Sequence, residues 1–263
     1  MEFLLLGSGT STGVPVPGCR CRVCTSNHPR NYRNRTSGFF RLDDGRGILI
    51  DATPDLRQQA INFQIESIDA VLFTHKHSDH ILGTDDLRSY NFVHGRRITC
   101  YGTDETLTGV ERVFPYIFNP EPGYKGGMLA QLDLVRVRGI GELTILGVPF
   151  QTFPLEHGDV TVTGFRVGSL GYATDCKRLS DEAIEVLRGV DTLLLDGLRY
   201  EPHDTHMTIP EAIETAANLG ARKTYLIHTT HTVDYDEVSA KLPAGVALGF
   251  DGLRIPLPQS LPT

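Results

Sequence analysis

The side chains best suited to chemistry lie in one short run, His-Lys-His-Ser-Asp-His at residues 75–80. Three imidazoles and a carboxylate this close together are ligands that suit borderline divalent cations such as Zn²⁺ and Mn²⁺. The run follows an apolar segment, residues 70–74, which predicts a buried strand. Alternation along that strand places His75 and His77 on one side, and a turn lets the aspartate and the third histidine face the same cavity. The alternative, a solvated polar loop, is disfavoured because imidazoles this close repel one another when protonated.

Three more candidate ligands, His157, Asp175 and His228, each come soon after an apolar segment that predicts a strand. Strand ends converge on one rim of a sheet, where α/β active sites form. Considered singly, these residues also fit a surface turn, a turn cap and a buried core histidine. Beside the motif at residues 75–80, metal ligation is the favoured interpretation. Together the candidates suffice for two cations, which need about seven ligands.

A second group of metal-ligand side chains begins with a Cys-x-Cys-x-x-Cys loop near the start of the chain. Three thiolates need a fourth ligand to complete a structural zinc site, and a histidine shortly after His228 is the candidate. The alternatives are a redox dithiol or unrelated thiols in an Arg-rich loop, although such tight spacing disfavours a disulfide. The expected ligands are Cys19, Cys21, Cys24 and His231, whereas Cys100 and Cys176 are expected to be buried bystanders.

Composition limits the class of protein. The chain has 263 residues and a net charge of −7, which argues against broad nucleic-acid binding because a phosphate backbone needs a positive footprint. No apolar run approaches the roughly 20 residues of a membrane helix. Residues 1–7 predict a first strand, not a signal peptide. We therefore expect one domain over residues 1–263, in the cytoplasm, with reduced cysteines and no membrane partner.

The elements that must position these side chains are strands first and alternating strands and helices later. Residues 37–50 predict a hairpin, and residues 119–128, rich in Pro and Gly, predict an irregular loop. Helices are predicted at residues 54–63, 103–114, 180–187 and 209–218. Further strands are predicted as a meander at 143–167, as buried strands at 192–196 and 224–227, and as paired strands at 246–257.

With these motifs in order, the sequence resembles the metallo-β-lactamase superfamily. The resemblance implies an α/β (α+β) fold, a four-layer αββα sandwich, with a dinuclear site of Zn²⁺ or Mn²⁺ at one edge. Asp51, which ends an apolar segment, matches that superfamily's supporting aspartate. By analogy one cation would be held by His75, His77 and His157, the other by Asp79, His80 and His228, with Asp175 bridging them.

The cysteine loop together with His228-Thr229-Thr230-His231 narrows the resemblance to the PhnP family of cyclic phosphodiesterases, and more distantly to tRNase Z. The match covers nearly the whole chain, including residues 7–10 and 249–252. It implies hydrolysis of a small cyclic phosphodiester, such as a phosphoribosyl cyclic phosphate, by a hydroxide shared between the two metals. His206 would be the general acid, and Asp79 would also orient the hydroxide. The alternative for His206 is a residue at the start of the next helix, and His203 is close enough to be confused with it.

The stretch between His80 and His157 is longer than in that family. Residues 116–142 are therefore expected to form a lid or a homodimer contact. The loop at residues 7–13 is not a phosphate-binding loop, because no Gly-Lys-Ser/Thr follows it. Arg88 is either a substrate contact or part of a solvated helix face. Five arginines between Arg20 and Arg35 either form a patch for an anion or flank the zinc loop.

Three other functions compete with a small-molecule phosphodiesterase. An RNA-processing nuclease of the tRNase Z type would need a docking arm or a basic face, and neither is evident. A thioesterase or lactonase uses the same fold. A PqqB-like accessory protein without enzymatic activity shares a similar cysteine loop but is expected to have a degraded histidine motif, whereas the motif at residues 75–80 is intact.

Overall fold

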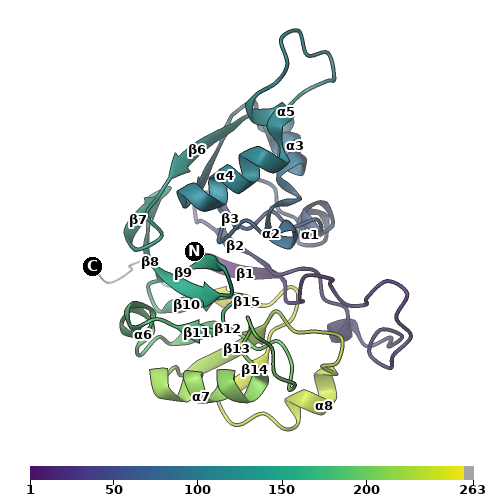
Figure 1. The fold of residues 1–263 in the computed structure, drawn as a ribbon, viewed down its shortest axis with the longest axis vertical. Coiled ribbons are helices and arrows are strands. Elements are labelled where there is room, and N and C mark those ends of the chain that lie inside the picture. The colour runs from purple at the N-terminus through teal and green to yellow at the C-terminus, as the bar shows by residue number, and fades with distance from the viewer. Residues whose placement is uncertain (258–263) are drawn as a thin grey trace.

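The computed structural model describes residues 1–257 and contains two β-sheets packed face to face (Figure 1). The strands of the first sheet are, in order, β15 (Arg254–Pro256), β1 (Glu2–Gly7), β2 (Ser37–Arg41), β3 (Gly47–Ile50), β4 (Ala70–Leu72), β5 (Ile98–Gly102) and β6 (Leu132–Arg136). The second sheet contains β11 (Arg178–Leu179), β8 (Val148–His157), β9 (Val160–Val167), β10 (Leu170–Ala173), β12 (Thr192–Asp196), β13 (Lys223–Ile227) and β14 (Val246–Leu248), with β7 (Gly141–Ile145) paired to β8.

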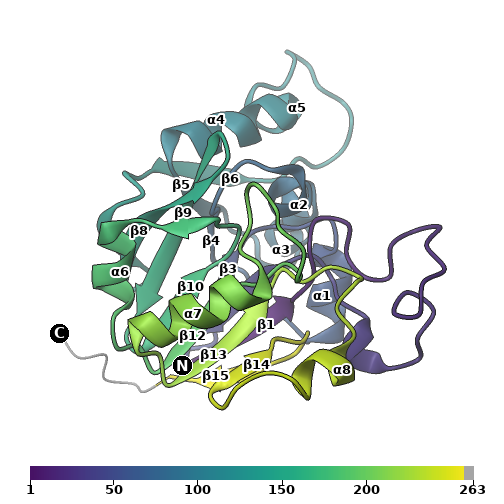
Figure 2. The same ribbon diagram turned by 60° about the horizontal axis from the view of Figure 1, so that its bottom comes forward.

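Helices cover the outer face of each sheet. Along the first sheet lie α1 (Leu56–Asn62), α2 (Ser78–Ile81), α3 (Arg88–His94), α4 (Asp104–Val113) and α5 (Pro115–Phe118). Along the second lie α6 (Asp181–Leu187), α7 (Ile209–Leu219) and α8 (Tyr235–Ser239), with α7 crossing β12 and β13 (Figure 2). Single 3₁₀ turns occupy Pro29–Asn31 and Thr84–Leu87. The layers are thus helix, sheet, sheet and helix, as predicted.

The core between the sheets is built from aromatic rings. Phe40 packs edge-on against Phe3 at a centroid distance of 5.0 Å and against Phe150 at 5.4 Å, and the Phe165 and Tyr172 rings stack at 4.9 Å. Such pairs each contribute about 0.5–1.5 kcal/mol beyond the area they bury. Because both sheets supply these rings, their packing fixes the position of one sheet relative to the other.

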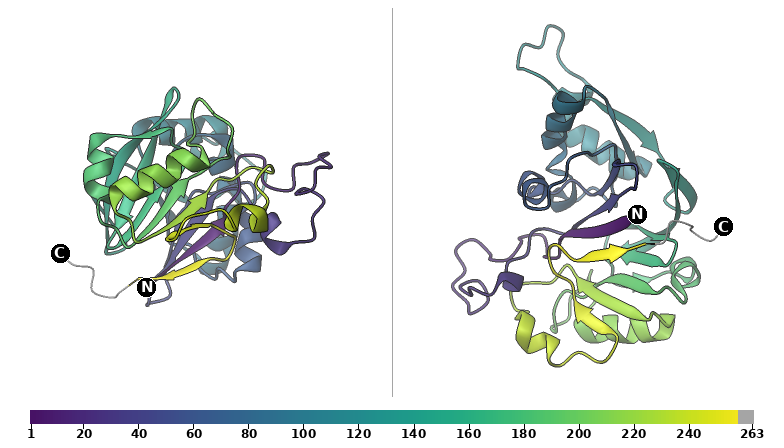
Figure 3. Two further views of the ribbon diagram at one scale, coloured as in Figure 1. Left: turned by 90° about the horizontal axis from the view of Figure 1, so that it is seen from below. Right: turned by 180° about the vertical axis from the view of Figure 1, so that it is seen from behind.

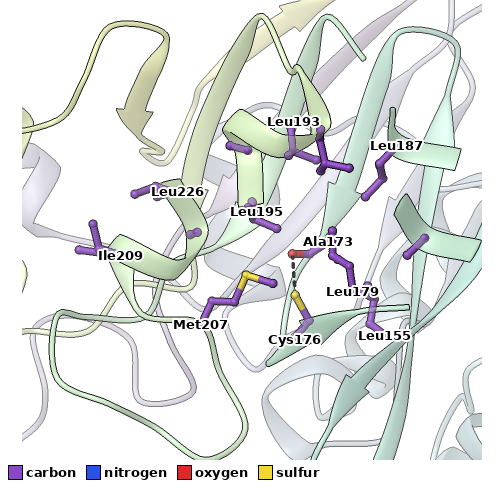
Figure 4. Packing of buried hydrophobic residues seen from close by; sticks show 14 of the residues in the cluster. Leu155, Ala173, Cys176, Leu179, Leu187, Leu193, Leu195, Met207, Ile209 and Leu226 are labelled. Atoms are coloured by element: carbon purple, nitrogen blue, oxygen red, sulfur yellow. Dashed lines mark hydrogen bonds between the residues drawn. The ribbon is translucent and has the colours of Figure 1, made fainter. Parts of the chain in front are cut away.

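Each sheet has a second apolar core beneath its helices. In the second sheet this core joins strand residues such as Leu195 and Leu226 to α7 and to Met207 and Cys176 in the connecting loops (Figure 4). Cys176 is fully buried and its thiol donates to the Ala173 carbonyl over 3.9 Å. Cys176 and Met207 therefore anchor the loops that carry the adjacent candidate site residues Asp175 and His206.

Local sequence signals explain most helix starts. Thr103 and Ser180 accept hydrogen bonds from the backbone N–H groups of Thr106 and Ala183, which caps α4 and α6. Thr208 and Glu211 form a reciprocal capping box at the start of α7. The predicted hairpin, the four predicted helices and the buried strands β12 and β13 are confirmed. The first helix begins at Leu56, two residues later than predicted.

One strand prediction is wrong. Residues 246–257 do not pair with each other, because β14 adds to β13 in the second sheet and β15 pairs antiparallel with β1 in the first. The two strands leave in different directions because residues 249–253 turn the chain from one sheet to the other. Figure 3 shows β15 beside β1, so the last described strand closes the edge of the first sheet.

The loop predicted at residues 119–128 has no regular structure and projects beyond α3 and α5 (Figure 1). It borders a shallow pocket of about 460 Å³, which includes Arg88, Phe92, Val93 and Met128. Arg88 itself pairs with Asp85 at 3.0 Å, which fits the solvated helix face. No helix within residues 1–257 has the length and apolarity needed to cross a bilayer.

Asp251 ties the end of the described chain to its beginning. Its Oδ1 accepts hydrogen bonds from the backbone N–H and the hydroxyl of Ser8 at 2.9 and 2.8 Å, and its Oδ2 accepts from the Asn34 N–H at 2.7 Å. Three donors from two distant loops thus converge on one carboxylate, and a buried N–H without an acceptor is costly.

We predict that Asp251→Asn lowers the free energy of unfolding by about 1–3 kcal/mol, because the new amide N–H₂ would face the Asn34 N–H. Urea denaturation monitored by circular dichroism measures this change. Asp133→Asn, at an exposed ion pair with Arg97, is the matched control and should change stability by less than about 1 kcal/mol. Equal free energies of unfolding for the two variants would show that the Asp251 carboxylate does not stabilise the fold through these hydrogen bonds.

Candidate dinuclear metal centre

The motif at residues 75–80 lies between β4 and α2. His75 is fully buried two residues after the extended Phe73, and His77 precedes the first turn of α2, which carries Asp79 and His80. The ring centroids of His75 lie 4.5 Å from His77 and 4.2 Å from His80. The structure thus brings the side chains of this motif close together, as predicted.

The second sheet brings the three remaining candidates to the same place. The imidazole Nε2 of His157 lies 3.3 Å from Nδ1 of His77, although 80 residues separate them in sequence. Asp175 places its two carboxylate oxygens 3.4 Å from His80 Nε2 and 3.2 Å from His228 Nε2. We call these seven residues the ligand cluster: His75, His77, Asp79, His80, His157, Asp175 and His228.

The ligand cluster divides into two groups, and within each group the ligand atoms lie within 4.8 Å of one another. One group is His75, His77 and His157, and the other is Asp79, His80, Asp175 and His228. Asp175 also lies within 4.8 Å of His157, so its carboxylate can reach both groups. This geometry matches the distribution of ligands that the family resemblance implies.

Backbone strain is concentrated at this centre. Asp51, Asp175 and His228 have φ angles of 62°, 51° and 60°, and the described residues contain only two other non-glycine residues with positive φ. Left-handed conformations cost of order 1–3 kcal/mol each for residues other than glycine, and persist only where the surroundings impose them. Each of these residues ends or follows a strand, and the unusual φ changes the direction of the chain there.

Asp51 orients the candidate ligands through hydrogen bonds on the side of the rings away from the proposed metals. Its carboxylate Oδ2 accepts from His80 Nδ1 and from the Thr74 hydroxyl, both at 2.7 Å, and Oδ1 accepts from the Thr74 N–H at 2.7 Å. The Thr74 oxygen in turn lies 3.1 Å from His75 Nδ1. Likewise His157 Nδ1 donates to the Thr205 carbonyl at 3.0 Å. These contacts occupy the Nδ1 atoms of the three imidazoles, so their Nε2 atoms are the ones that would bind a cation.

The cluster contains more buried polar atoms than it can satisfy internally. The Nε2 atoms of His75, His80 and His228 are buried and have no hydrogen-bond partner among the described residues. His80 Nε2 lies 3.2 Å from the Asp79 carboxylate, but this close approach lacks hydrogen-bond geometry. Unpartnered lone pairs facing carboxylates are what bound cations would satisfy, so the residues fit two divalent metals.

The charges within the cluster are strongly coupled. Burial raises the pKa of Asp175, but the adjacent His228 and His80 outweigh it and hold the pKa well below the usual range. Burial and the nearby His80 together lower the pKa of His75 well below its ordinary value. Burial also lowers the pKa of His80 and of His228, but Asp175 and Asp79 outweigh it and raise both pKa values. Because imidazoles ligate metals in their neutral form, cations would displace protons from His80 and His228.

His206 lies at the rim of the cluster. Its ring centroid is 4.6 Å from His157 and 4.7 Å from His228, and its Nδ1 donates to Asp196 at 2.6 Å. Since α7 begins at Ile209 with Thr208 as its cap, His206 lies before the helix. The alternative residue, His203, accepts a hydrogen bond from the Thr205 N–H and has no carboxylate partner among the described residues.

Asp196 was not identified from the sequence, although it ends a predicted buried strand as the other site aspartates do. It is fully buried, and its Oδ2 also accepts the Cys176 N–H at 2.8 Å. The same strand-end rule that selected Asp175 would have found it. Without the fold, nothing indicated that its partner would be His206.

The cysteine loop and His231 also come together. The thiols of Cys19, Cys21 and Cys24 lie 3.4, 3.4 and 3.6 Å from His231 Nδ1, and all five cysteines are free. A hydrogen bond from the Cys24 N–H lowers the pKa of Cys21 to about 6, whereas burial raises that of Cys24 to about 11. We call these four residues the Cys cluster. Three thiols and one imidazole in this arrangement fit a tetrahedral zinc site.

The arginines around this loop are largely used internally. The guanidinium of Arg22 contacts Glu237, Arg30 donates to the Tyr235 hydroxyl at 2.8 Å, and Arg35 pairs with Asp55 at 2.8 Å. Arg33 is buried. The alternative that these charges flank a zinc loop is therefore better supported than a patch for an anion.

Residues 46–229, which contain the whole ligand cluster, match the model of the β-lactamase superfamily domain. The chain belongs to the metallo-β-lactamase superfamily. A crystal structure of a new diphosphatase from the PhnP family is 39% identical, with a TM-score of 0.90 and 99% of each chain covered. This member of the superfamily is thus related to a known hydrolase of the PhnP family.

Two further proteins are similar to this chain. An octanoyltransferase of Porphyromonas gingivalis is 38% identical over 97% of this chain, which spans only 51% of that longer protein. The Zn²⁺-bound PqqB of Methylobacterium extorquens has a TM-score of 0.76 at 21% identity, with 98% of this chain and 100% of that one covered. The latter likeness shows the fold alone.

We predict that Asp51→Asn lowers the affinity of the ligand cluster for Zn²⁺ or Mn²⁺ by about 10–100-fold, because one carboxylate oxygen becomes an N–H₂ group. This group would face either the Thr74 N–H or the two donors His80 Nδ1 and the Thr74 hydroxyl. Asparagine tolerates the left-handed backbone, so the loss would not arise from strain. Isothermal titration of metal-free protein measures it, with Asp133→Asn as the surface control. Unchanged affinity would show that Asp51 does not support the metal ligands.

We further predict that Cys24→Ser loses about one equivalent of bound zinc per chain and unfolds at a lower temperature. Cys100→Ala, at a buried thiol outside the Cys cluster, should keep its full zinc content. Elemental analysis and thermal unfolding on the same samples test both statements. Zinc retained by Cys24→Ser would argue against a structural site.

Proposed function

We propose that the protein is a two-metal hydrolase of small phosphodiesters, with a cyclic phosphodiester such as a phosphoribosyl cyclic phosphate as the favoured substrate. The observation that carries the proposal is the position of the Asp196–His206 pair beside the seven-residue ligand cluster. A metal site alone is common to many activities of this fold, but phosphoester cleavage also needs a proton donor for the leaving oxygen.

When two divalent cations are bound, they lower the pKa of a water molecule and neutralise charge on the phosphoryl oxygens. The protein supplies the remaining parts. Asp51 and the Thr205 carbonyl fix the orientation of His80 and His157. Asp79 would be a metal ligand and would also orient the attacking water. The seven ligands would hold the cations beside the proton donor.

His206 would deliver the proton. Its Nδ1 donates to Asp196, so its Nε2 is free to face the leaving oxygen. The buried carboxylate fixes the orientation of the ring, so that the imidazolium form of His206 would release its Nε2 proton to the leaving oxygen. The Cys176 N–H and the capped start of α7 hold this pair in place.

A diphosphate is a second candidate substrate, because the related PhnP-family protein is described as a diphosphatase. Both reactions break a P–O bond at an anionic phosphorus. They differ in the leaving group, since a sugar alkoxide is far more basic than a phosphate and depends more strongly on protonation. Loss of the His206 imidazole should therefore slow hydrolysis of the phosphodiester more than hydrolysis of the diphosphate.

The competing functions are less well supported. A tRNA-processing nuclease needs a positive face, whereas the net charge is −7 and most loop arginines have internal partners. A PqqB-like accessory role does not require the Asp196–His206 pair. A thioesterase or lactonase would not need metal-assisted attack at phosphorus, and a substrate panel decides this.

The panel compares a cyclic phosphodiester, a diphosphate ester, a thioester and a tRNA precursor with the metal-loaded protein. We expect kcat/KM to be highest for one of the first two and to vary little with salt. Highest activity on the thioester, or salt-sensitive cleavage of the tRNA precursor, would overturn the proposal.

We predict that His206→Ala lowers kcat on an alkyl phosphodiester by about 10²–10⁴-fold while metal content stays unchanged. The loss should be much smaller with bis-p-nitrophenyl phosphate, whose leaving group needs no proton. His203→Ala is the matched control and should retain most of its activity. A similar loss on both substrates would remove the general-acid role.

A further inference from the structure

Arg33 is a charged side chain that the proposed chemistry does not use. It is only 2% exposed and is the largest fully buried side chain among the described residues. Burial lowers its pKa to about 10, although Asp251, Asp234 and Cys24 attract the charge and oppose this shift. It therefore stays positively charged at neutral pH, with no salt bridge to a carboxylate among residues 1–257. A buried cation must be compensated by hydrogen bonds.

Those hydrogen bonds hold one short turn. Nη1 donates to the Thr229 hydroxyl at 2.6 Å and, more weakly, to the Thr230 carbonyl at 3.4 Å, while Nη2 donates to the Val233 carbonyl. This turn, residues 229–233, starts immediately after His228 of the ligand cluster and contains His231 of the Cys cluster. One guanidinium thus fixes the segment that connects the two candidate metal sites.

Arg33 is itself held by the base of the cysteine loop. Its backbone N–H and carbonyl pair with those of Val14 at 2.7 and 2.8 Å. The three cysteines lie on the chain between Val14 and Arg33, so this pair closes the loop that carries the Cys cluster. Any change in the loop is transmitted to the guanidinium through its own backbone.

The turn is also held by backbone hydrogen bonds to two other loops. Thr229 N–H donates to the Ser8 carbonyl at 3.1 Å, and Thr230 N–H donates to the Leu198 carbonyl at 3.0 Å. His228 has a strained φ of 60°, which persists only where neighbouring groups impose it. The position of the His228 imidazole therefore depends on how firmly the turn is held.

We propose that Arg33 is a positioning residue that couples the Cys cluster to the ligand cluster, so that metal bound at the first raises the metal affinity of the second. This inference rests on the metal-binding part of the proposed function and not on any substrate. Coupling between sites is reciprocal, so metal at the ligand cluster also stabilises metal at the Cys cluster. The planar, branched donor set of arginine reaches several acceptors at once, which a lysine ammonium cannot reproduce.

Co²⁺ titration of the full-length, metal-free protein tests the coupling without any substrate. Thiolate ligands give an intense near-ultraviolet charge-transfer band, so absorbance separates binding at the Cys cluster from binding at the ligand cluster. The variants are wild type, Cys24→Ser, Arg33→Met and the double variant. Val167→Ala, in the core between the sheets, is the control for a general loss of stability.

We expect Cys24→Ser and Arg33→Met each to lower the Co²⁺ affinity of the ligand cluster by about 10-fold, the lower end for lost supporting contacts. Arg33→Met should keep the thiolate band. The double variant should be no weaker than the weaker single variant, because both changes break one connection. Val167→Ala should lower the unfolding temperature and leave the affinity unchanged.

Affinities within twofold of wild type in both single variants would overturn the proposal, as would losses that add in the double variant. If Arg33→Met does not fold, Thr229→Val removes one acceptor at nearly constant volume and should reproduce a smaller loss. Phosphodiesterase activity without coupling between the two metal sites would overturn this inference and leave the proposed function standing. Coupling without phosphodiesterase activity would overturn the proposed function and leave this inference standing.

Discussion

The whole centre depends on one electrostatic constraint. Imidazole nitrogens and carboxylates from distant parts of the chain are buried within a few ångströms of each other, and several of the nitrogens have no hydrogen-bond partner within residues 1–257. In a medium of low polarity such groups cannot be left unsatisfied without a large cost. Divalent cations would satisfy them, so metal binding would stabilise this edge of the protein as well as supply its chemistry.

The fold meets that constraint by joining two sheets. The motif at residues 75–80 follows a strand of the first sheet. In the second sheet His157 ends β8, whereas Asp175 and His228 follow β10 and β13. The site is thus complete only when the aromatic core between the sheets has formed. Positive φ angles at Asp175 and His228 show that the backbone is held in strained conformations at the points of ligation.

Much of this could be predicted from the sequence. The motif at residues 75–80 is local, so its residue types and spacing indicated a metal site, and strand ends indicated where its partners would lie. The distribution of the ligands over two cations came from the family resemblance. The hairpin and the capped helices follow from short-range signals such as Ser180 and Thr208.

What could not be predicted depends on long-range contacts. Asp196 gains its role only because β12 and the loop before α7 bring it to His206. Arg33 resembles any other arginine of its loop until the turn at residues 229–233 surrounds it. The separation of β14 and β15 into different sheets is set by their partners, β13 and β1, and not by their own residues.

Anomalous X-ray diffraction from crystals grown with Zn²⁺ or Mn²⁺ tests the central claim most directly. The account predicts two anomalous peaks within the ligand cluster, with Asp175 in contact with both, and a separate zinc peak between Cys19, Cys21, Cys24 and His231. Crystals supplied with metal whose ligand cluster shows no anomalous peak, with its imidazoles hydrogen-bonded to one another, would contradict it.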